Sequence, residues 1–290
     1  MTDSSGATRS SIAPARELLA RHGLSPKKSL GQNFLVDPRV QDRIVAAAQV
    51  RANDIVVEIG AGLGALTARL ADLAGKVIAV DKDTRLVEVL RAELGNRSNI
   101  EIVLGDALEF AFVQTAREVG QPLVVVGNLP YVITSPLLFA TIEAAAGGRV
   151  VDRAIFMVQK EFAQRMLAPP GSRVYGRLSV MVQQACEAEI LFHVGAGAFL
   201  PAPAVTSSVL RLRPRKQPLA QVHDAPMFAR LVREAFGARR KMLRRALEPA
   251  FGPCASAALA AAGIEGTRRA EELSVADFAR LANALSASHA

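Results

Sequence analysis

Short apolar runs rich in valine and isoleucine alternate, along much of the chain, with stretches that repeat apolar positions at helical spacing. Such runs predict buried strands, and strands that alternate with helices predict a parallel sheet covered on both faces. Two further strands are expected over 187–193 and 207–213, and the second alternates apolar and basic residues. The other expected strands are 55–59, 76–80, 100–104, 123–126 and 154–158, with helices such as 65–74 and 85–94 between them.

The residues before this region predict a leader, a short helix, a basic loop and a longer helix. Residues 1–13 are expected to form a flexible leader, of which 1–11 are small and polar without an apolar signal region, and 14–22 is expected to be helical. A basic loop is expected over 24–36. Asp37 as N-cap and Pro38 at the first helical position then predict a helix that reaches about Ala48.

After the prolines at positions 214 and 218, no strand-like run remains. Ser274, with Asp277 three residues later, is typical of a capping box at the start of a helix. Helices are expected over 228–247, 255–262 and 275–285. The fold class is therefore α/β with a small C-terminal all-α domain. The expected parts are a flexible leader with a short helix over 1–24, a sheet domain over 25–214 and a helical domain over 215–290.

Composition narrows the setting in which the protein works. Half of the residues are hydrophobic and 21% are charged, which excludes a disordered chain. The net charge of +8 favours a polyanionic partner such as nucleic acid, although a merely basic surface fits it as well. Two distant cysteines, Cys186 and Cys254, and four scattered histidines predict neither a disulfide framework nor a metal site, and favour the cytoplasm. The uncharged stretch 121–142 contains glycine and prolines, so a membrane span is not expected.

The sharpest local pattern is Gly60-Ala61-Gly62-Leu63-Gly64, directly after an expected strand. Glycines allow a tight turn and a close approach of the backbone to a ligand. The spacing differs from the dinucleotide pattern, and the Lys-Ser/Thr of a phosphate-binding loop is missing. S-adenosylmethionine carries no phosphates and suits such a turn. A bare strand–helix connection is the alternative interpretation.

Two acids at the ends of the next strands support a nucleoside-containing cofactor. Asp81 ends its strand about twenty residues after the glycine turn, at the position that binds ribose hydroxyls in doubly wound sheets. Asp106 follows the third strand and is suited to accept a hydrogen bond from the adenine amine of the cofactor. A nicotinamide-dependent enzyme remains the main rival at this stage.

The fourth strand runs into Asn128-Leu129-Pro130-Tyr131, which indicates the reaction. The N6 amine of adenine is a weak nucleophile, and two acceptors, the Asn128 amide oxygen and the Leu129 carbonyl, can localise its lone pair. Pro130 stiffens the turn, and Tyr131 offers a ring on which a base can stack, worth ~1–3 kcal/mol. Phe199, between glycine-rich and proline-rich segments, is a candidate for the other face of the base. A loop without catalytic function is the alternative.

Together these segments resemble the ribosomal RNA adenine N6-dimethyltransferase family, the KsgA type. The matching stretches lie in order from about residue 27 to residue 245. They are Leu30–Leu35, Val57–Gly60, Gly105–Ala107, Gly127–Tyr131, Gln159–Glu161, Tyr175–Ser179, Pro201–Val205 and Phe236–Lys241.

This resemblance implies a Rossmann-like sheet that binds S-adenosylmethionine and releases S-adenosylhomocysteine. It implies that the enzyme methylates, twice each, two adjacent adenosines near the 3′ end of 16S rRNA, late in assembly of the small ribosomal subunit. It implies Tyr131 and Phe199 as the aromatic pair around the target base. The implied cofactor-binding residues are Asn33, Leu35, Gly60, Gly62, Asp81, Asp106 and Asn128.

Three positions depart from the family pattern. Asp81 stands where members often carry glutamate, Val132 where bacterial members carry asparagine, and Ala204 where lysine is common. Asp81 keeps the negative charge of glutamate on a shorter side chain. Val132 removes a polar group, and Ala204 removes a potential phosphate contact.

Two clusters of basic residues are candidates for RNA binding, because lysine and arginine neutralise phosphates without reading sequence. A solvated helix face is the alternative for the second cluster, which is expected on a helix. The clusters are Lys27 with Lys28, and Arg239, Arg240 and Lys241 with Arg244 and Arg245.

Two other functions remain open. One is an enzyme that methylates adenine in 23S rRNA and confers antibiotic resistance, and the other is an RNA-binding assembly factor without catalysis. A cofactor-binding titration would distinguish the assembly factor from an enzyme. A monomer without membrane attachment is expected.

Overall fold

A computed structural model describes residues 12–27, 30–129, 134–145 and 150–287. By contacts it divides into two compact units. The α/β unit comprises residues up to Lys160 together with Glu189–Pro214, and the helical unit comprises Glu161–Ala188 together with Arg215–Ala290. Each unit is described by itself.

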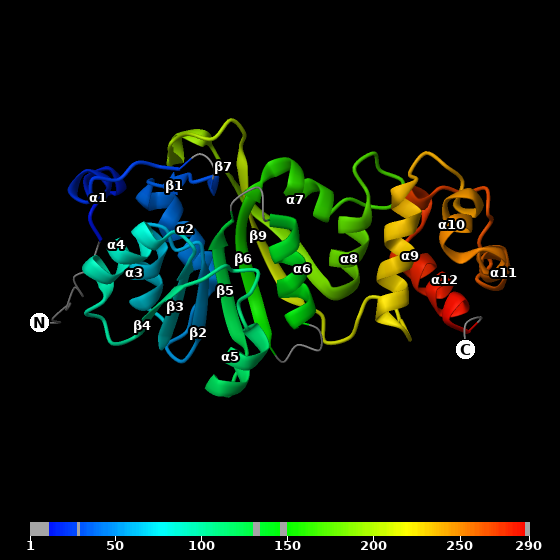
Figure 1. The fold of residues 1–290 in the computed structure, drawn as a ribbon, viewed down its shortest axis with the longest axis horizontal. Helices are drawn as coiled ribbons and strands as arrows, with labels where there is room; N and C mark the ends of the chain where they lie inside the picture. The colour runs from blue at the N-terminus through cyan, green and yellow to red at the C-terminus, as the bar shows by residue number, and fades with distance from the viewer. Residues whose placement is uncertain (1–11, 28–29, 130–133, 146–149, 288–290) are drawn as a thin grey trace, which may run out of the picture. The chain divides into compact units, whose positions relative to one another are not determined.

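A seven-stranded sheet in the order β4-β3-β2-β5-β6-β9-β7 forms the centre of the α/β unit (Figure 1). Neighbouring strands from β4 to β6 are parallel, and β9 runs antiparallel to β6. The central strands are almost wholly buried because both faces are covered, which explains their continuous valine and isoleucine runs. The strands are β2 (Ile55–Ile59), β3 (Lys76–Asp81), β4 (Ile100–Leu104), β5 (Leu123–Asn128), β6 (Val151–Gln159), β7 (Cys186–Val194) and β9 (Ser207–Pro214).

The order in which strands are added to the sheet reverses after β4. Successive strands lie further outward from β2 to β4, and the next strand, β5, lies on the other side of β2. Because crossovers between parallel strands are right-handed, this reversal places α3 and α4 on one face and α5 and α6 on the other. The crossover helices are α3 (Ala65–Ala71), α4 (Thr84–Leu94), α5 (Phe112–Val119) and α6 (Thr134–Ala145). The gap between β2 and β5 is therefore the topological switch point, where ligands bind in such sheets.

An N-terminal segment adds a second, two-stranded sheet. Helix α1 (Ala15–Arg21) packs its Leu18 and Leu19 with Leu63 and Leu86 of the main fold. β1 (Phe34–Leu35) pairs antiparallel with β8 (Phe199–Leu200), which follows the short helix η2 (Ala196–Ala198). Helix α2 (Pro38–Ala48) begins as expected, because the Asp37 carboxylate accepts a hydrogen bond from the Arg39 amide at 2.9 Å.

Helices that surround one apolar core form the second unit. The core contains Tyr175 and Val180 together with Phe228, Leu247 and Phe278. The elements are α7 (Lys160–Met166), α8 (Arg177–Ala185), α9 (Ala225–Gly237), α10 (Leu243–Phe251), α11 (Pro253–Ala261), η3 (Ala270–Glu272) and α12 (Val275–Ala287).

Two expectations from the sequence need correction. Residues 161–188 were assigned to the sheet domain, but Tyr175 and Val180 pack into the core of the helical unit, so the contacts place this stretch there. The helix expected over 228–247 is two helices, α9 and α10, because α9 ends at Gly237 and the chain turns through residues 238–242. The Ser274–Asp277 capping box is present, with both reciprocal bonds between 2.9 and 3.1 Å.

No helix within the described residues is long and apolar enough to cross a membrane.

Candidate functional site

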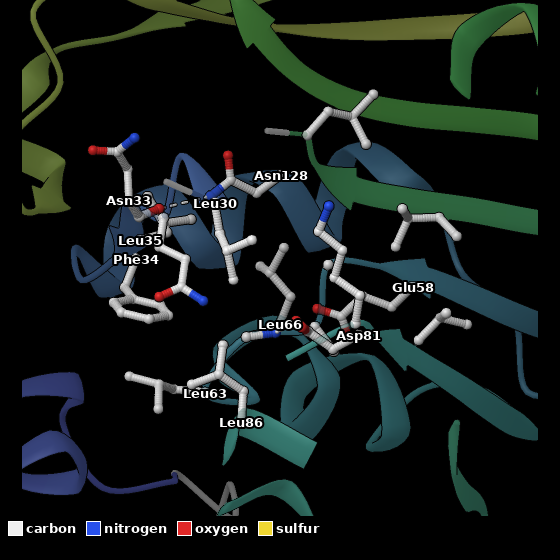
Figure 2. Close-up of a pocket in the computed structure, with 18 of the residues that line it drawn as sticks. Leu30, Asn33, Phe34, Leu35, Glu58, Leu63, Leu66, Asp81, Leu86 and Asn128 are labelled. Carbon is white, nitrogen blue, oxygen red and sulfur yellow. Dashed lines mark hydrogen bonds between the residues drawn. The ribbon is translucent and has the colours of Figure 1, made fainter. Parts of the chain in front are cut away.

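A cleft lies at the carboxyl ends of β2, β3, β4 and β5, at the switch point of the sheet (Figure 2). It encloses about 1100 Å³, including the solvent at its mouth. All of its lining residues belong to the α/β unit. The sequence candidates that line it are Asn33, Leu35, Gly60, Gly62, Asp81, Asp106, Asn128, Leu129 and Phe199.

The glycine turn forms the floor between β2 and α3. Gly60 and Gly62 have φ angles of 71° and 60°, a region that glycine enters without steric cost. The Gly60 amide donates to the Val80 carbonyl at 2.9 Å, which holds the turn against β3. A Cβ on Gly62 would lie 3.5 Å from the Phe34 ring, so the turn also packs closely under the N-terminal segment.

Asp81 holds the backbone of the glycine turn and of the residues that follow β3. Its Oδ2 accepts from the Gly62 amide at 2.8 Å, and its Oδ1 accepts from the Asp83 amide at 2.9 Å. Burial raises the pKa of the Asp81 carboxyl, and the two amide bonds oppose that rise. Each carboxylate oxygen has a second lone pair, so Asp81 can still accept from ribose hydroxyls.

Asp106 lies at the end of β4, between Gly105 and Ala107, and all three line the cleft. Its Oδ1 accepts from the Leu108 amide at 3.0 Å, which fixes the carboxylate at the start of the following loop. The carboxylate is half-buried and keeps the capacity to accept a hydrogen bond from an amine.

Glu58 is a third acid of the cleft, and it was not among the predicted site residues. It lies on β2, is 2% exposed, and accepts a hydrogen bond from the Thr67 hydroxyl at 2.5 Å. Burial raises the pKa of Glu58 to about 8, and the neighbouring Asp81 adds to the rise. The signal in the sequence was an ionisable residue inside the otherwise apolar run 55–59.

The N-terminal segment contributes residues 30–35 to the lining of the cleft. Leu35 is 5% exposed, and its carbonyl accepts from the Gln41 side chain at 2.7 Å. The Asn33 side chain donates to the Gly31 carbonyl at 3.1 Å. Gln32, a residue that the sequence did not single out, donates to Asp83 at 2.9 Å.

Asn128, the last residue of β5, has its side-chain amide fixed in one orientation. Its Nδ2 donates to the Asn33 backbone carbonyl at 3.0 Å (Figure 2). The amide oxygen is therefore the end that remains for another donor. Leu129 follows, 1% exposed, and its own amide donates to Met157 at 3.1 Å, so the chain keeps its strand register as far as this residue.

The two aromatic candidates differ in what the structure describes. Phe199 lines the cleft, is 5% exposed, and lies opposite Leu35 in the β1–β8 pair. Pro130 and Tyr131, together with Val132, lie outside the described residues. The described side of the expected base site therefore consists of Asn128, Leu129 and Phe199.

The basic candidates fall into different environments. Lys27 lies with its ammonium 3.9 Å from Asp83, and Lys28 is outside the described residues. In the helical unit, residues 239–241 lie in the turn between α9 and α10, which corrects the expectation of a helix. The Arg239 guanidinium bonds Glu271 at 2.8 Å and also the Arg173 carbonyl.

The other basic side chains of this cluster are turned outward. Arg240, Lys241, Arg244 and Arg245 are exposed. Among them, Arg245 contacts Glu248 at 3.4 Å.

The parallel sheet, the glycine turn at its switch point and the asparagine at the end of β5 define a Rossmann-like methyltransferase. Two solved structures share this fold. One is a dimethyladenosine transferase from Plasmodium falciparum, with 30% identity, a TM-score of 0.71, and coverage of 86% of this chain and 95% of that one. The other is the 23S rRNA methyltransferase ErmE, with 30% identity, a TM-score of 0.65, and coverage of 88% and 100%.

The chain belongs to the ribosomal RNA adenine dimethylase family, whose model matches residues 23–287. Curated relatives named ribosomal RNA small subunit methyltransferase A agree with this assignment. The protein from Magnetococcus marinus is 45% identical over 92% of this chain and 94% of its own length. The protein from Xanthomonas euvesicatoria pv. vesicatoria is 47% identical over 89% and 95%.

Proposed function

We propose that this enzyme transfers methyl groups from S-adenosylmethionine to N6 of two adjacent adenosines near the 3′ end of 16S rRNA. Each adenosine is methylated twice during late assembly of the small subunit, by a monomer in the cytoplasm. The names of the relatives at 45–47% identity support the small subunit as substrate. The observation that carries the chemistry is the fixed orientation of the Asn128 amide in the cleft.

The acids and glycines of the cleft support S-adenosylmethionine as the cofactor. Asp81 and Asp106 offer carboxylate oxygens to the ribose and the adenine amine, and Gly60 and Gly62 allow close approach of the backbone. Asn33 and Leu35 would hold the cofactor from the N-terminal segment. When bound, S-adenosylmethionine supplies an electrophilic methyl group. No group of three or more potential metal ligands gathers in the described part of the chain.

The residues of the chain act on the adenine amine by positioning and polarisation. The Asn128 amide oxygen and the Leu129 carbonyl accept its two N–H groups, which localises the nitrogen lone pair toward the methyl group. Because the Asn128 nitrogen is engaged by Asn33, the acceptor end of the amide is preorganised and needs no reorganisation during the reaction. Catalysis of this kind rests on geometry and electrostatics rather than on a strong base.

A side-chain base is not required for the proton that leaves. The methylated nitrogen is cationic and releases its proton readily to water. Phe199 contributes by stacking on one face of the adenine, which must leave its RNA stack to enter the cleft. The basic side chains Lys27, Lys28, Arg240, Lys241, Arg244 and Arg245 supply phosphate contacts, with Arg239 behind them.

The test is methylation of undermethylated small subunits by the purified protein with labelled cofactor, followed by digestion of the RNA and identification of the nucleoside. The expected product is N6,N6-dimethyladenosine at two adjacent positions. Fully methylated small subunits and large subunits serve as controls. Label on large subunits instead would favour the 23S reaction, to which ErmE at 30% identity points. Cofactor binding without methylation of either subunit would favour an assembly factor.

A further inference from the structure

Residues 30–35, here called the strap, all line the cleft. We propose that Gln32 is a positioning residue, which ties this strap to Asp83 and thereby aligns both the ribose-binding acid Asp81 and the catalytic amide of Asn128. This inference rests on the proposed function. It assigns a role to a residue that contacts neither reacting atom.

Both ends of the Gln32 side chain are engaged. Its Oε1 accepts from the Lys27 backbone amide at 2.8 Å, and its Nε2 donates to Asp83 Oδ2 at 2.9 Å. A side chain with one acceptor and one donor is needed for this pair of bonds. Glutamate would turn an oxygen toward the carboxylate of Asp83, and methionine would make neither bond.

Asp83 passes this connection on to the cofactor pocket. The side chain of Asp83 is 2% exposed, so its position is set by the protein around it. Its backbone amide donates to Asp81 Oδ1 at 2.9 Å, and Asp81 Oδ2 accepts from Gly62. A path of four residues therefore runs from the strap to the glycine turn through Gln32, Asp83, Asp81 and Gly62.

The next residue of the strap reaches the catalytic side of the cleft. The Asn33 carbonyl accepts from the Asn128 amide at 3.0 Å. A shift of the strap therefore moves the acceptor that orients Asn128. Because Gln32 and Asn33 are adjacent, one segment couples the cofactor side to the target base.

The charge of Asp83 does not depend on Gln32. The Arg85 guanidinium bonds both carboxylate oxygens, at 3.0 and 2.6 Å. This pair is the largest cause of the lowered pKa of Asp83, about 2, and the Gln32 bond adds to it. Loss of Gln32 thus leaves Asp83 paired, while the strap loses its connection on this side.

The decisive variant is Gln32→Met, which keeps length but forms no hydrogen bond. Gln114→Met is the matched control, since Gln114 lies on α5 and bonds only Glu118 in its own helix among the described residues. Cofactor affinity is measured by calorimetry in the absence of RNA. Methylation of small subunits is measured at saturating cofactor, and Tm by thermal unfolding.

For Gln32→Met we expect a cofactor Kd raised about tenfold and a kcat lowered about tenfold, with KM for the subunit within twofold of the wild type. A hydrogen bond to a charged group has about this weight. Tm should stay within about 3 °C, because few interactions of the fold are lost. Gln114→Met should match the wild type in all four quantities.

Gln32→Glu tests the bond to Asp83 directly. It keeps an acceptor for the Lys27 amide but places an oxygen against Asp83 Oδ2, so it should raise the cofactor Kd at least as much as Gln32→Met. An unchanged Kd and kcat in Gln32→Met would overturn the proposal, and so would an unchanged Kd in Gln32→Glu. Inactivity of the wild type on small subunits would instead refute the proposed function, since cofactor affinity is measured without RNA.

Discussion

The side-chain amide of Asn128 donates to the backbone carbonyl of Asn33 at 3.0 Å, although 95 positions separate the two residues in the chain. This bond decides which end of the amide is available in the cleft. Only the nitrogen can donate to a carbonyl, so the oxygen is left to accept from an incoming amine. The orientation of the Asn128 amide is thus set before any substrate arrives.

Asn128→Ala should abolish most methyl transfer. The loss of one preorganised polar group at a reacting centre lowers kcat by about 10²- to 10³-fold. Cofactor affinity should change by only a few fold, because the carboxylates and the glycine turn remain. Asn128→Asp should be similarly inactive, since a carboxylate cannot donate to Asn33. Single-turnover methylation and calorimetry check both variants, and full activity of Asn128→Ala would refute the mechanism.

Phe199→Leu should weaken use of the RNA substrate and leave cofactor binding unchanged. The leucine keeps an apolar side chain in the core that Phe199 helps to build, but it removes the ring that we propose stacks on the adenine. A lost stacking contact of ~1–3 kcal/mol corresponds to a fall in kcat/KM of roughly 5- to 150-fold. Tm should fall by only a few degrees. Unaltered kcat/KM would show that Phe199 belongs to the core alone.

Glu58→Gln should remove a pH dependence of stability. The folded pKa of Glu58 is about 8, against 4.5 as its ordinary value, so between these values the folded state holds a proton that the unfolded state has lost. The contribution of Glu58 to stability is then fully present below pH 4.5 and decreases as pH rises to 8, by about 1.4 kcal/mol per unit. Glutamine stays neutral and can still accept from Thr67. Denaturant unfolding of both proteins from pH 5 to 8 should show the difference between them change along this slope, and parallel curves would refute it.

The exposed basic side chains of the turn between α9 and α10 should contribute to RNA affinity through charge alone. Arg240→Ala and Lys241→Ala should each lower the slope of log Kd against log salt by about one. Arg239→Ala should lower Tm instead, because its guanidinium holds Glu271 and the Arg173 carbonyl. Filter binding to small subunits at several salt concentrations measures the slopes. Equal salt slopes and equal Tm values for the three variants would contradict this division.

Local sequence patterns were sufficient to predict an element that forms from its own residues. The run 55–59 and the three glycines after it predicted β2 and its turn within a residue, since burial on both faces demands a continuous apolar strand. The positions of Asp81 and Asp106 in the cleft could also be predicted, because the ends of parallel strands meet at one edge of a sheet.

Patterns failed where distant segments decide the outcome. Gln32 and Asp83 are 51 positions apart, and no local sequence pattern at either residue predicts their hydrogen bond. The sequence of residues 161–188 does not predict which core they pack into, because their partners Phe228 and Phe278 lie far along the chain. The helix through 239–241 was expected from composition, but Gly237 ends α9 and Arg239 turns toward Glu271.

The helical unit is assembled from two stretches of chain, and three junctions separate it from the rest of the sequence. A single cut cannot detach it. A truncated protein that ends before Arg215 would keep Tyr175 and Val180 but lose the side chains that cover them. Exposed apolar surface of this kind promotes aggregation. Exchange of this unit between relatives therefore requires transplantation of both stretches together.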